Sequence, residues 1–271
     1  MLEVRGLRQT FNPGGANEVR ALQGVDLALD AGSFVVVVGT NGSGKSTLLG
    51  AVAGDFAVQQ GSIRLDGVDV THWPAHRRAR RIGRVYQAPL AGTAPHLTIA
   101  ENLALAGQRA TPPRRLRRAL RGATRRQLAE RVATLGMGLE DRLDTPIGNL
   151  SSGERQALTL LMATLVRPEL LLLDEHTAAL DPRSAEQVMQ LTEQAIERDH
   201  LTTLMVTHSM QQAVRFGDRA IMIHSGRVVQ DVSGARKRRL RVDDLLRSFE
   251  EVRNADLLDE SAARMLAAQY V

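Results

Sequence analysis

Hydrophobic residues fall into short runs that alternate with amphipathic and polar segments along the chain. Residues 34–38 and 170–173 are unbroken apolar runs, which are typical of strands buried on both faces of a sheet. Residues 202–207 and 219–224 also have strand character, and a helix is predicted between them. Because helical patterns separate these strands, we expect a parallel sheet that is covered by helices.

The N-terminal part of the chain has a different pattern. Residues 2–8 and 19–29 alternate between apolar and polar positions, and the turn sequence Asn12-Pro13-Gly14-Gly15 lies between them. This arrangement predicts an antiparallel β ribbon. Two further short strands are predicted at residues 62–65 and 83–87.

Helical periodicity dominates several other segments. An amphipathic helix is predicted over residues 45–53, and a mostly helical stretch extends from about residue 98 to residue 136. Residues 153–167 predict a further helix. Asp181 followed by Pro182 has the N-cap and N1 preferences of another helix start.

Composition narrows the class of protein. The chain of 271 residues contains no cysteine, which excludes disulfides, thiolate metal sites and a cysteine nucleophile. Only 3% of the residues are aromatic, so the core must be built from aliphatic side chains. The longest apolar stretch, residues 158–166, is far shorter than the roughly 20 residues that a membrane-spanning helix needs. The N-terminus lacks the apolar region of a secretory signal, so we expect a soluble, cytoplasmic protein.

Basic residues are unevenly distributed. The net charge is +5 and the pI is near 10.5, which suits an anionic partner such as nucleic acid or a membrane surface. Of the 35 basic residues, only Lys45 and Lys237 are lysine. Outside three acid-free windows, acidic side chains outnumber basic ones, so we expect an acidic-to-neutral body that carries basic patches. The windows comprise Arg77, Arg78, Arg80, Arg81 and Arg84; Arg109, Arg114, Arg115, Arg117, Arg118, Arg121, Arg125 and Arg126; and Arg236, Lys237, Arg238, Arg239 and Arg241.

A glycine-rich segment between the first buried run and the first predicted helix matches the pattern G-x-x-x-x-G-K-[ST]. Its glycines let the backbone wrap closely around a phosphate, and the helix that follows adds its positive N-terminal end. Lys45 is a compact charge that can reach the β- and γ-phosphates, and Ser46 offers its hydroxyl to Mg²⁺. The sequence therefore predicts a nucleotide-binding site. It comprises Gly39, Thr40, Asn41, Gly42, Ser43, Gly44, Lys45, Ser46 and the next residue, Thr47.

Two carboxylates, Asp174 and Glu175, follow the apolar run 170–173 directly. Open α/β sheets place their ligands at this end of the strands. Asp174 is predicted to act on Mg²⁺, and Glu175 is predicted to polarise an attacking water.

The segment Leu150-Ser151-Ser152-Gly153-Glu154-Arg155-Gln156 resembles the LSGGQ signature of ABC transporter nucleotide-binding subunits. Together with the glycine-rich segment and the acidic strand end, it gives a resemblance that covers about residues 1–235. The implied fold is α/β, with a P-loop NTPase-like parallel sheet core, an antiparallel β ribbon and an inserted α-helical subdomain at about 98–165. A helical C-terminal tail over 236–271 follows, with its helix predicted at 242–268.

In this family the signature completes the ATP site of the opposite subunit. The resemblance therefore implies that Ser151, Gly153 and Glu154 contact a nucleotide held by a second copy. The chain departs from the pattern at Ser152, which replaces a glycine, and at Glu154, which replaces a glutamine. A carboxylate at Glu154 should weaken phosphate binding if it points inward. His176 stands where the family has proline, and we interpret it as a structural substitution.

Other family positions occur in the expected order. Phe11 matches the aromatic residue that stacks on adenine, although a core-facing strand aromatic is the alternative. Gln87 matches the glutamine that touches Mg²⁺ and the attacking water, and Asp181 matches the loop that crosses the dimer interface. His208 follows a predicted strand and matches the histidine that contacts the γ-phosphate.

The resemblance implies hydrolysis of MgATP between two copies of the chain. Glu175, His208, Lys45 and Gln87 are the implied catalytic residues, and Ser46, Gln87 and Asp174 are the implied metal contacts. The chain has one P-loop, so a functional unit needs two chains. It has no predicted membrane segment, so the translocation path must lie in separate integral membrane permease subunits.

Three segments, 88–95, 174–182 and 205–208, look similar to a bacterial importer subfamily described as tryptophan/tyrosine-type or uncharacterised. This similarity implies a peripheral location at the cytoplasmic face of the inner membrane, and a periplasmic solute-binding protein as an indirect partner. The alternatives are an iron–sulfur assembly ATPase and a nucleic-acid-associated ABC protein. Neither a coiled-coil insertion nor a second ABC domain is present, so we expect no nucleic-acid partner. The Arg run 109–126 either engages the permease or anionic lipid, or forms a solvated helix face.

Overall fold

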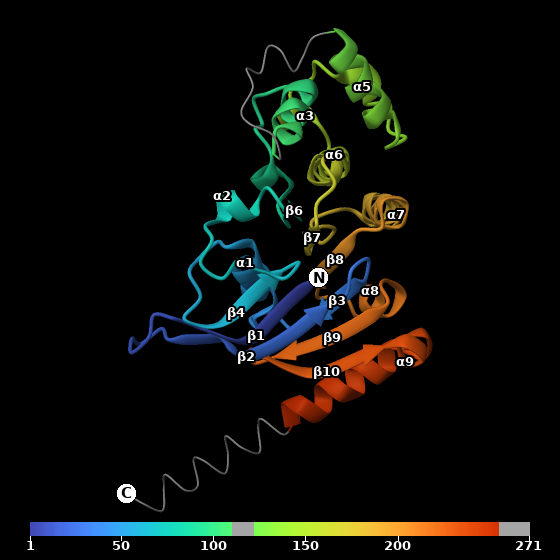
Figure 1. Ribbon diagram of the computed structural model, residues 1–271. Helices are drawn as coiled ribbons and strands as arrows, with labels where there is room; N and C mark the ends of the chain where they lie inside the picture. The colour runs from blue at the N-terminus through green and yellow to red at the C-terminus, as the bar shows by residue number, and fades with distance from the viewer. Residues whose placement is uncertain (110–121, 255–271) are drawn as a thin grey trace, which may run out of the picture.

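The computed structural model describes residues 1–109 and 122–254 (Figure 1). Its centre is a six-stranded sheet with the order β10-β9-β3-β8-β7-β6, in which every neighbouring pair is parallel except β9 and β10. The predicted parallel sheet is therefore confirmed, with one antiparallel edge strand. The strands are β3 (Phe34–Val38), β6 (Ile82–Val85), β7 (Leu170–Asp174), β8 (Thr202–Thr207), β9 (Arg219–His224) and β10 (Arg227–Ser233).

A second, antiparallel sheet has the order β2-β1-β4-β5. The predicted ribbon forms two of its four strands, β1 (Leu2–Phe11) and β2 (Val19–Leu29), which pair antiparallel. Strands β4 (Gln60–Leu65) and β5 (Val68–Asp69) extend the sheet on the other side of β1. The sequence did not predict β5, because two residues are too few to give an alternating pattern.

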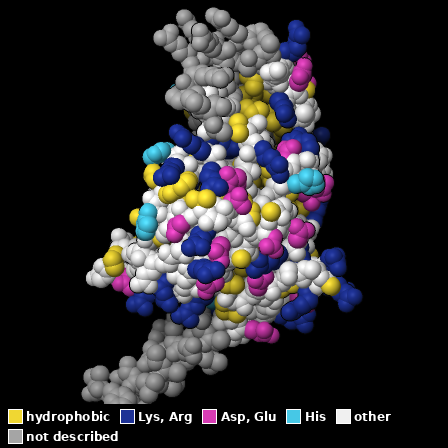
Figure 2. All heavy atoms as spheres, viewed as in Figure 1, with side chains coloured by type: hydrophobic (Ala, Val, Ile, Leu, Met, Phe, Trp, Pro, Cys, Tyr) yellow, Lys and Arg dark blue, Asp and Glu magenta, His cyan; other side chains and the backbone are white. Residues whose placement is uncertain are grey.

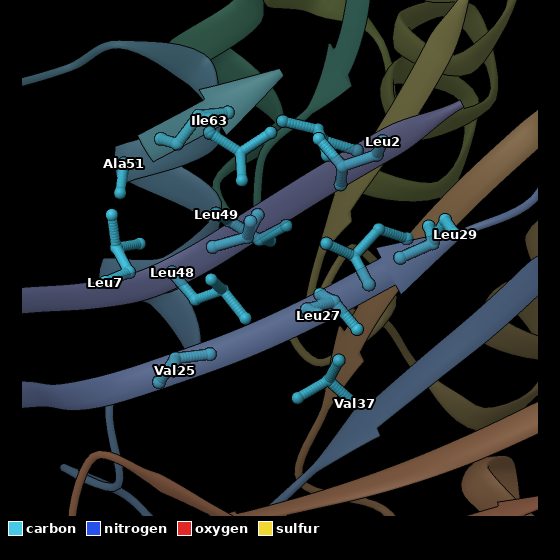
Figure 3. Close-up of a cluster of buried hydrophobic side chains, with 14 of the residues drawn as sticks. Leu2, Leu7, Val25, Leu27, Leu29, Val37, Leu48, Leu49, Ala51 and Ile63 are labelled. Atoms are coloured by element: carbon cyan, nitrogen blue, oxygen red, sulfur yellow. The ribbon is translucent and has the colours of Figure 1, made fainter. Parts of the chain in front are cut away.

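The parallel sheet separates two hydrophobic cores, because successive side chains of a strand point to opposite faces. Val35 and Val37 of β3 pack into the core shared with the antiparallel sheet and helix α1 (Lys45–Ala53). Figure 3 shows this core, with Leu27 of β2, Val37 and Leu48 among its members. Val36 and Val38 point to the other core. The run 34–38 is therefore apolar at every position because its side chains pack alternately into the two cores.

Helices cover the second face. They are α6 (Ser152–Thr164), α7 (Pro182–Asp199), α8 (Met210–Arg215) and a C-terminal helix at 242–254. Shorter elements are α2 (Ala75–Arg78), α9 (Gly234–Arg239), η1 (Pro89–Gly92), η2 (Glu140–Arg142) and η3 (Ile147–Asn149).

A helical region at the top of Figure 1 has a third core of its own. It contains α3 (Ile99–Gly107) and α5 (Gly122–Ala133), and α6 joins it to the sheet. The predicted stretch 98–136 corresponds to α3 and α5, and residues 110–121 lie outside the described residues. For the predicted tail helix, residues 242–254 are helical and 255–268 lie outside the described part of the chain.

The first basic window, residues 77–84, is partly structural. Arg78 is 1% exposed, and its guanidinium donates four hydrogen bonds, to the carbonyls of Ala51, Val52, Thr71 and Trp73. On the face that Figure 2 shows, arginines are interspersed with acidic side chains. The structure therefore corrects our expectation for this window: Arg81 pairs with Glu169 at 2.6 Å, and Arg84 pairs with Asp55 at 2.6 Å.

The other two windows are also partly structural. Arg109 is half-buried and donates to the carbonyls of Ala163 and Val166. Lys237 is 5% exposed, and its Nζ donates to the carbonyl of Val214 at 2.8 Å. Because Val214 lies in the last turn of α8, Lys237 satisfies a carbonyl that a helix end leaves free. Arg114, Arg115, Arg117, Arg118 and Arg121 lie outside the described residues, so the role of that run stays a prediction.

No helix within residues 1–109 and 122–254 has the length and apolar character needed to cross a bilayer.

We predict that Arg78→Met lowers the free energy of unfolding by about 3 kcal/mol, because it leaves buried carbonyls without donors. Urea denaturation measures the loss. Arg80→Met is the matched control, since Arg80 belongs to the same basic window and is exposed. Equal stability of the two variants would contradict the structural role of Arg78.

Candidate functional site

A cavity of about 640 Å³ lies where β3, β7 and β8 end. A cavity of similar volume, about 660 Å³, lies at the opposite end of the sheet beside Lys237, and it contains none of the residues that the sequence singled out for chemistry. The first cavity brings together most of those residues. Its lining includes Phe11, Asn41, Gly42, Gly44, Lys45, Ser46, Thr47, Gln87, Glu175 and His208.

The loop that leads into α1 forms one wall of this cavity. Gly44 is the N-cap of α1 with φ 103°, and a Cβ atom there would lie 2.3 Å from the carbonyl oxygen of Ala21. Only glycine fits this position. Within the described residues no side chain caps the helix, so its first amide N–H groups are available to an anion. The buried Ser43 hydroxyl also has no hydrogen-bond partner among the residues that the structure describes. These free donors fit a phosphate.

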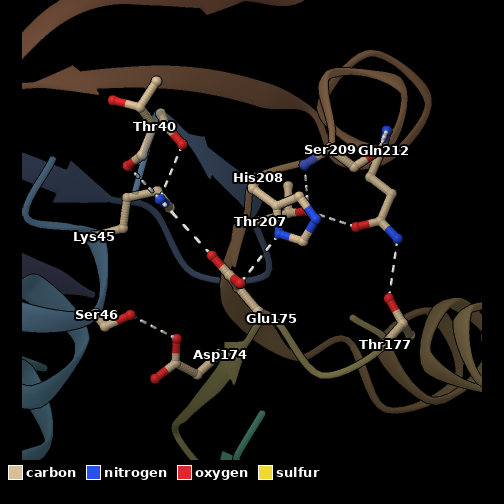
Figure 4. Close-up of polar contacts among 11 residues, drawn as sticks. Thr40, Lys45, Ser46, Asp174, Glu175, Thr177, Thr207, His208, Ser209 and Gln212 are labelled. Carbon is tan, nitrogen blue, oxygen red and sulfur yellow. Dashed lines mark hydrogen bonds and ion pairs between the residues drawn. The ribbon is translucent and has the colours of Figure 1, made fainter. Parts of the chain in front are cut away.

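Lys45 is held at the base of the loop. It is 4% exposed, and its Nζ donates to the carbonyls of Gly39 and Thr40, both at 2.9 Å (Figure 4). Burial lowers the pKa of Lys45, and the negative charges of Glu175 and Asp174 oppose this shift. The ammonium group is therefore fixed in position and has a nearby counter-charge.

Asp174 ends β7 and faces Ser46 of α1. The Ser46 hydroxyl donates to Asp174 Oδ1 at 3.2 Å, and Nη2 of Arg84 lies 3.7 Å from Asp174 Oδ2. Burial raises the pKa of Asp174, while the contacts with Ser46 and Arg84 lower it. The sequence predicted Ser46 and Asp174 each as a contact to Mg²⁺, but it placed Arg84 only in a basic window.

The oxygen atoms of Ser46 and Asp174 are suitable ligands for Mg²⁺. This ion prefers oxygen ligands and is bound by one or two protein groups together with substrate phosphates and water. A hydroxyl and a carboxylate meet that requirement. In the described part of the chain no cluster of three or more His, Asp or Glu side chains could hold a metal ion.

Glu175 lies between Lys45 and His208. Its Oε1 is 3.8 Å from Lys45 Nζ, and its Oε2 accepts a hydrogen bond from His208 Nδ1 at 3.1 Å (Figure 4). Its backbone has φ 43°, a left-handed conformation that is unusual for a non-glycine residue. The Glu175 N–H donates to the carbonyl of Val206 on β8 at 2.9 Å. These contacts aim the carboxylate into the cavity, where it can accept a proton from water.

Phe11 and Gln87 lie at the rim. Phe11 is 36% exposed and meets Phe56 edge to face, with ring centroids 5.5 Å apart. Its position in the cavity wall leaves ring surface available to a planar base. Gln87 is exposed two residues beyond the end of β6. Both positions agree with contacts to a ligand, and both roles stay predictions.

The signature segment does not contribute to this cavity. Ser151 is the N-cap of α6, and Glu154 closes a capping box with it. The Glu154 carboxylate also accepts a hydrogen bond from Arg142 at 2.7 Å, so it turns toward its own helix and a neighbouring cation. Gly153 lies so close to α7 that a Cβ atom would be 2.8 Å from Ser184 Oγ.

Asp181, the predicted interface residue, also lies outside the cavity lining. Its Oδ1 accepts from the N–H groups of Arg183 and Ser184, both at 3.1 Å, which confirms it as the N-cap of α7. Ser184 thus connects Asp181 with the neighbourhood of Gly153. The structure brings the signature and Asp181 together at the N-terminal end of α7, and neither lines the cavity that contains Lys45 and Glu175.

The sequence matches a known protein family. The model of the ABC transporter family matches residues 22–178. The chain belongs to the ABC transporter family, as an ATP-binding subunit. It is therefore an ABC-type ATPase, and ATP is its nucleotide.

Individual relatives agree. The tyrosine transport ATP-binding protein of Clostridioides difficile is 39% identical over 251 residues, which are 92% of this chain and 99% of that protein. The lipoprotein-releasing system ATP-binding protein LolD 1 of Caulobacter vibrioides is 34% identical over 86% of this chain and 96% of its own length.

A solved structure also matches. The dimeric ATP-binding cassette MJ0796, in a post-hydrolysis state bound to ADP and Pi, superimposes with a TM-score of 0.74 at 27% identity. The match covers 86% of this chain and 98% of that one. The expected ABC ATPase fold is confirmed.

In this ABC ATPase, His176 is 2% exposed and follows the two acidic residues. The Thr192 hydroxyl donates to the Val188 carbonyl, so it accepts from His176 Nε2 at 3.1 Å. Burial lowers the pKa of His176 to about 4. The ring is therefore neutral and packed inside the protein, as expected for a structural substitution.

We predict that His176 makes the protein less stable in acid. Its folded pKa of about 4 lies below the ordinary value of about 6.5, so the unfolded chain binds the proton more tightly. Stability from this group is present above about pH 6.5 and is lost as the pH falls toward 4. Between pH 7 and pH 5 the loss is about 2 kcal/mol. Urea denaturation of His176→Leu should lack this component, and an equal loss in both proteins would contradict the assignment.

Proposed function

We propose that the chain is the ATP-hydrolysing subunit of an ABC importer for an amino-acid-type solute. It dimerises and drives uptake through separate permease subunits at the cytoplasmic face of the bacterial inner membrane. The observation that supports hydrolysis most strongly is the contact of Glu175 with Lys45 and His208 inside one cavity. The tyrosine transport relative, matched over 99% of its length, supports the solute class.

The residues of the cavity have separate roles in ATP hydrolysis. Lys45 and the amides of the loop 39–46 bind the β- and γ-phosphates, and Phe11 stacks on the adenine. Glu175 accepts a hydrogen bond from the attacking water and holds it in line with the γ-phosphorus. In its doubly protonated form, His208 donates its Nε2–H to the γ-phosphate and its Nδ1–H to the Glu175 carboxylate. Catalysis in this scheme consists of positioning and electrostatic stabilisation.

Mg²⁺ fits the groups at the end of β7. Ser46, Asp174 and Gln87 would hold it, directly or through water. The ion would supply positive charge that neutralises the phosphate oxygens. Arg84 and Ser46 keep the Asp174 carboxylate oriented toward this place.

A second copy supplies the missing part of the site. Ser151, Gly153, Glu154 and Asp181 lie outside the cavity, so they would reach the ATP of a facing subunit. The N-terminal end of α6, which Ser151 and Glu154 cap within this chain, carries the positive end of the helix dipole and is suited to a γ-phosphate. The dimeric state of the matched MJ0796 cassette supports this assembly.

We divide the chain into an ATPase domain over residues 1–235 and a C-terminal tail over 236–271. The helical region at 98–165 lies within the first and would face the permease. A periplasmic solute-binding protein would deliver the solute to the permease, so no residue of this chain needs to contact it.

Glu175→Gln should reduce kcat for ATP hydrolysis about 100-fold or more, because the amide cannot accept the proton of water. ATP affinity should persist, since Lys45 and the loop amides remain. Glu197→Gln is the matched control, because Glu197 is exposed on α7. The kcat of each variant is measured by phosphate release at saturating ATP.

A normal rate for Glu175→Gln would overturn the role of Glu175. The same variant tests the dimer: size-exclusion chromatography with ATP should show twice the monomer mass. A monomer at saturating ATP would contradict the shared site.

Uptake by intact cells tests the solute. Cells that carry Lys45→Met in place of the natural chain should accumulate labelled tyrosine several-fold more slowly, because the transporter loses its energy source. Cells that carry Arg80→Met are the control. Unchanged tyrosine uptake, together with lost ATPase activity of the purified variant, would refute the solute class and leave the ATPase assignment standing.

A further inference from the structure

Helix α8 begins two residues after His208, and its first turn carries Gln212. The side-chain amide of Gln212 connects Thr207, at the end of β8, with Thr177, in the loop that follows β7 (Figure 4). Thr207 Oγ1 donates to Gln212 Oε1 at 2.6 Å, and Gln212 Nε2 donates to Thr177 Oγ1 at 3.0 Å. One planar group thus makes one bond as acceptor and one as donor.

Both threonines are adjacent to residues of the proposed catalytic site. Thr207 is the last residue of β8 and precedes His208 directly, and Thr177 lies two residues after Glu175. Thr207 is 3% exposed and Thr177 is 6% exposed. Because water has little access to this bridge, its hydrogen bonds are stronger than bonds at the surface.

The orientation of the amide follows from its neighbours. The Ser209 N–H donates to Thr207 Oγ1 at 3.0 Å, so the hydroxyl hydrogen of Thr207 is directed to the Gln212 carbonyl oxygen. This leaves the NH₂ group to face Thr177. The Gln212 N–H donates to Ser209 Oγ at 3.3 Å, which anchors the first turn of α8. The bridge therefore has a defined direction and a fixed base.

The Glu175–His208 contact needs such a support. The two residues are 33 positions apart in the chain, and a single hydrogen bond of 3.1 Å joins their side chains. Glu175 also holds an unusual backbone conformation, which persists only where surrounding contacts determine it. Gln212 fixes the loop after Glu175 relative to the residue before His208.

We propose that Gln212 is a positioning residue for ATP hydrolysis, whose amide holds the Glu175 and His208 loops at the separation that the reaction needs. Gln212 is absent from the cavity lining among the described residues, so it acts through these two side chains. The inference rests on the proposed function of Glu175 and His208.

Replacing Gln212 by leucine keeps the approximate size and removes both hydrogen bonds. Gln212→Leu should lower kcat about tenfold or more, because small misplacements of catalytic groups are costly. The KM for ATP and the affinity for a fluorescent ATP analogue should stay within about twofold, because the phosphate-binding loop is untouched. Gln211→Leu is the matched control: it changes the neighbouring, exposed glutamine of the same helix and should leave kcat unchanged.

Thr177→Val gives a second, milder test that does not depend on the folding of Gln212→Leu. It removes one end of the bridge with little change in volume and should also lower kcat at constant KM. The double variant Thr177→Val, Gln212→Leu should be no slower than Gln212→Leu alone, because both changes break the same bridge.

Three results would overturn the inference. They are an unchanged kcat in both single variants, a parallel loss of ATP affinity, and independent, multiplicative losses in the double variant. Glu175→Gln separates this outcome from failure of the proposed function. If Glu175→Gln loses activity while Gln212→Leu does not, only the positioning role is wrong; if Glu175→Gln is fully active, the site itself is wrong.

Discussion

The structure depends on three parallel strands that end at the same edge of one sheet. β8 is hydrogen-bonded to β3 on one side and to β7 on the other, with Thr207 opposite Val38 and Val206 opposite Asp174. This register places Glu175 and His208 beside the loop that carries Lys45. Apolar side chains on both faces of these strands hold the register, because a slip of one residue would exchange the two cores. The positions of Glu175 and His208 are therefore determined by the packing of the two hydrophobic cores on the faces of the sheet.

The polar groups at that edge compensate one another. Burial lowers the pKa of Lys45, and the nearby carboxylates of Glu175 and Asp174 offset part of that shift. Burial likewise raises the pKa of Asp174, and the contacts with Ser46 and Arg84 offset part of that shift. A phosphate group brought into the cavity would find a fixed ammonium group and free amides without any rearrangement of the chain. His176 does not line this cavity, because its neutral ring is buried and hydrogen-bonded to Thr192 of α7.

Local patterns predicted much of this arrangement. The apolar runs predicted β3, β7 and β8, and the glycine-rich spacing predicted the start of α1 at Lys45, because both depend only on neighbouring residues. Contacts across long separations were not visible. Arg78 was predicted as surface charge, although it donates to four backbone carbonyls. No local pattern indicated a role for Lys237, whose Nζ donates to the Val214 carbonyl. The Gln212 bridge joins residues 177, 207 and 212, and no sequence spacing encodes it.

We propose that one chain holds the phosphate-binding loop and the water-activating pair, and that the signature that completes the ATP site comes from a second copy. Mixing two variants, Lys45→Met and Ser151→Phe, tests it most directly. Each alone should hydrolyse ATP poorly, because every site in its homodimer lacks one half. In the mixture, heterodimers contain one site built from the intact loop of one copy and the intact signature of the other. ATPase activity should therefore reappear on mixing, whereas a mixture as inactive as its two components would refute a site shared between copies.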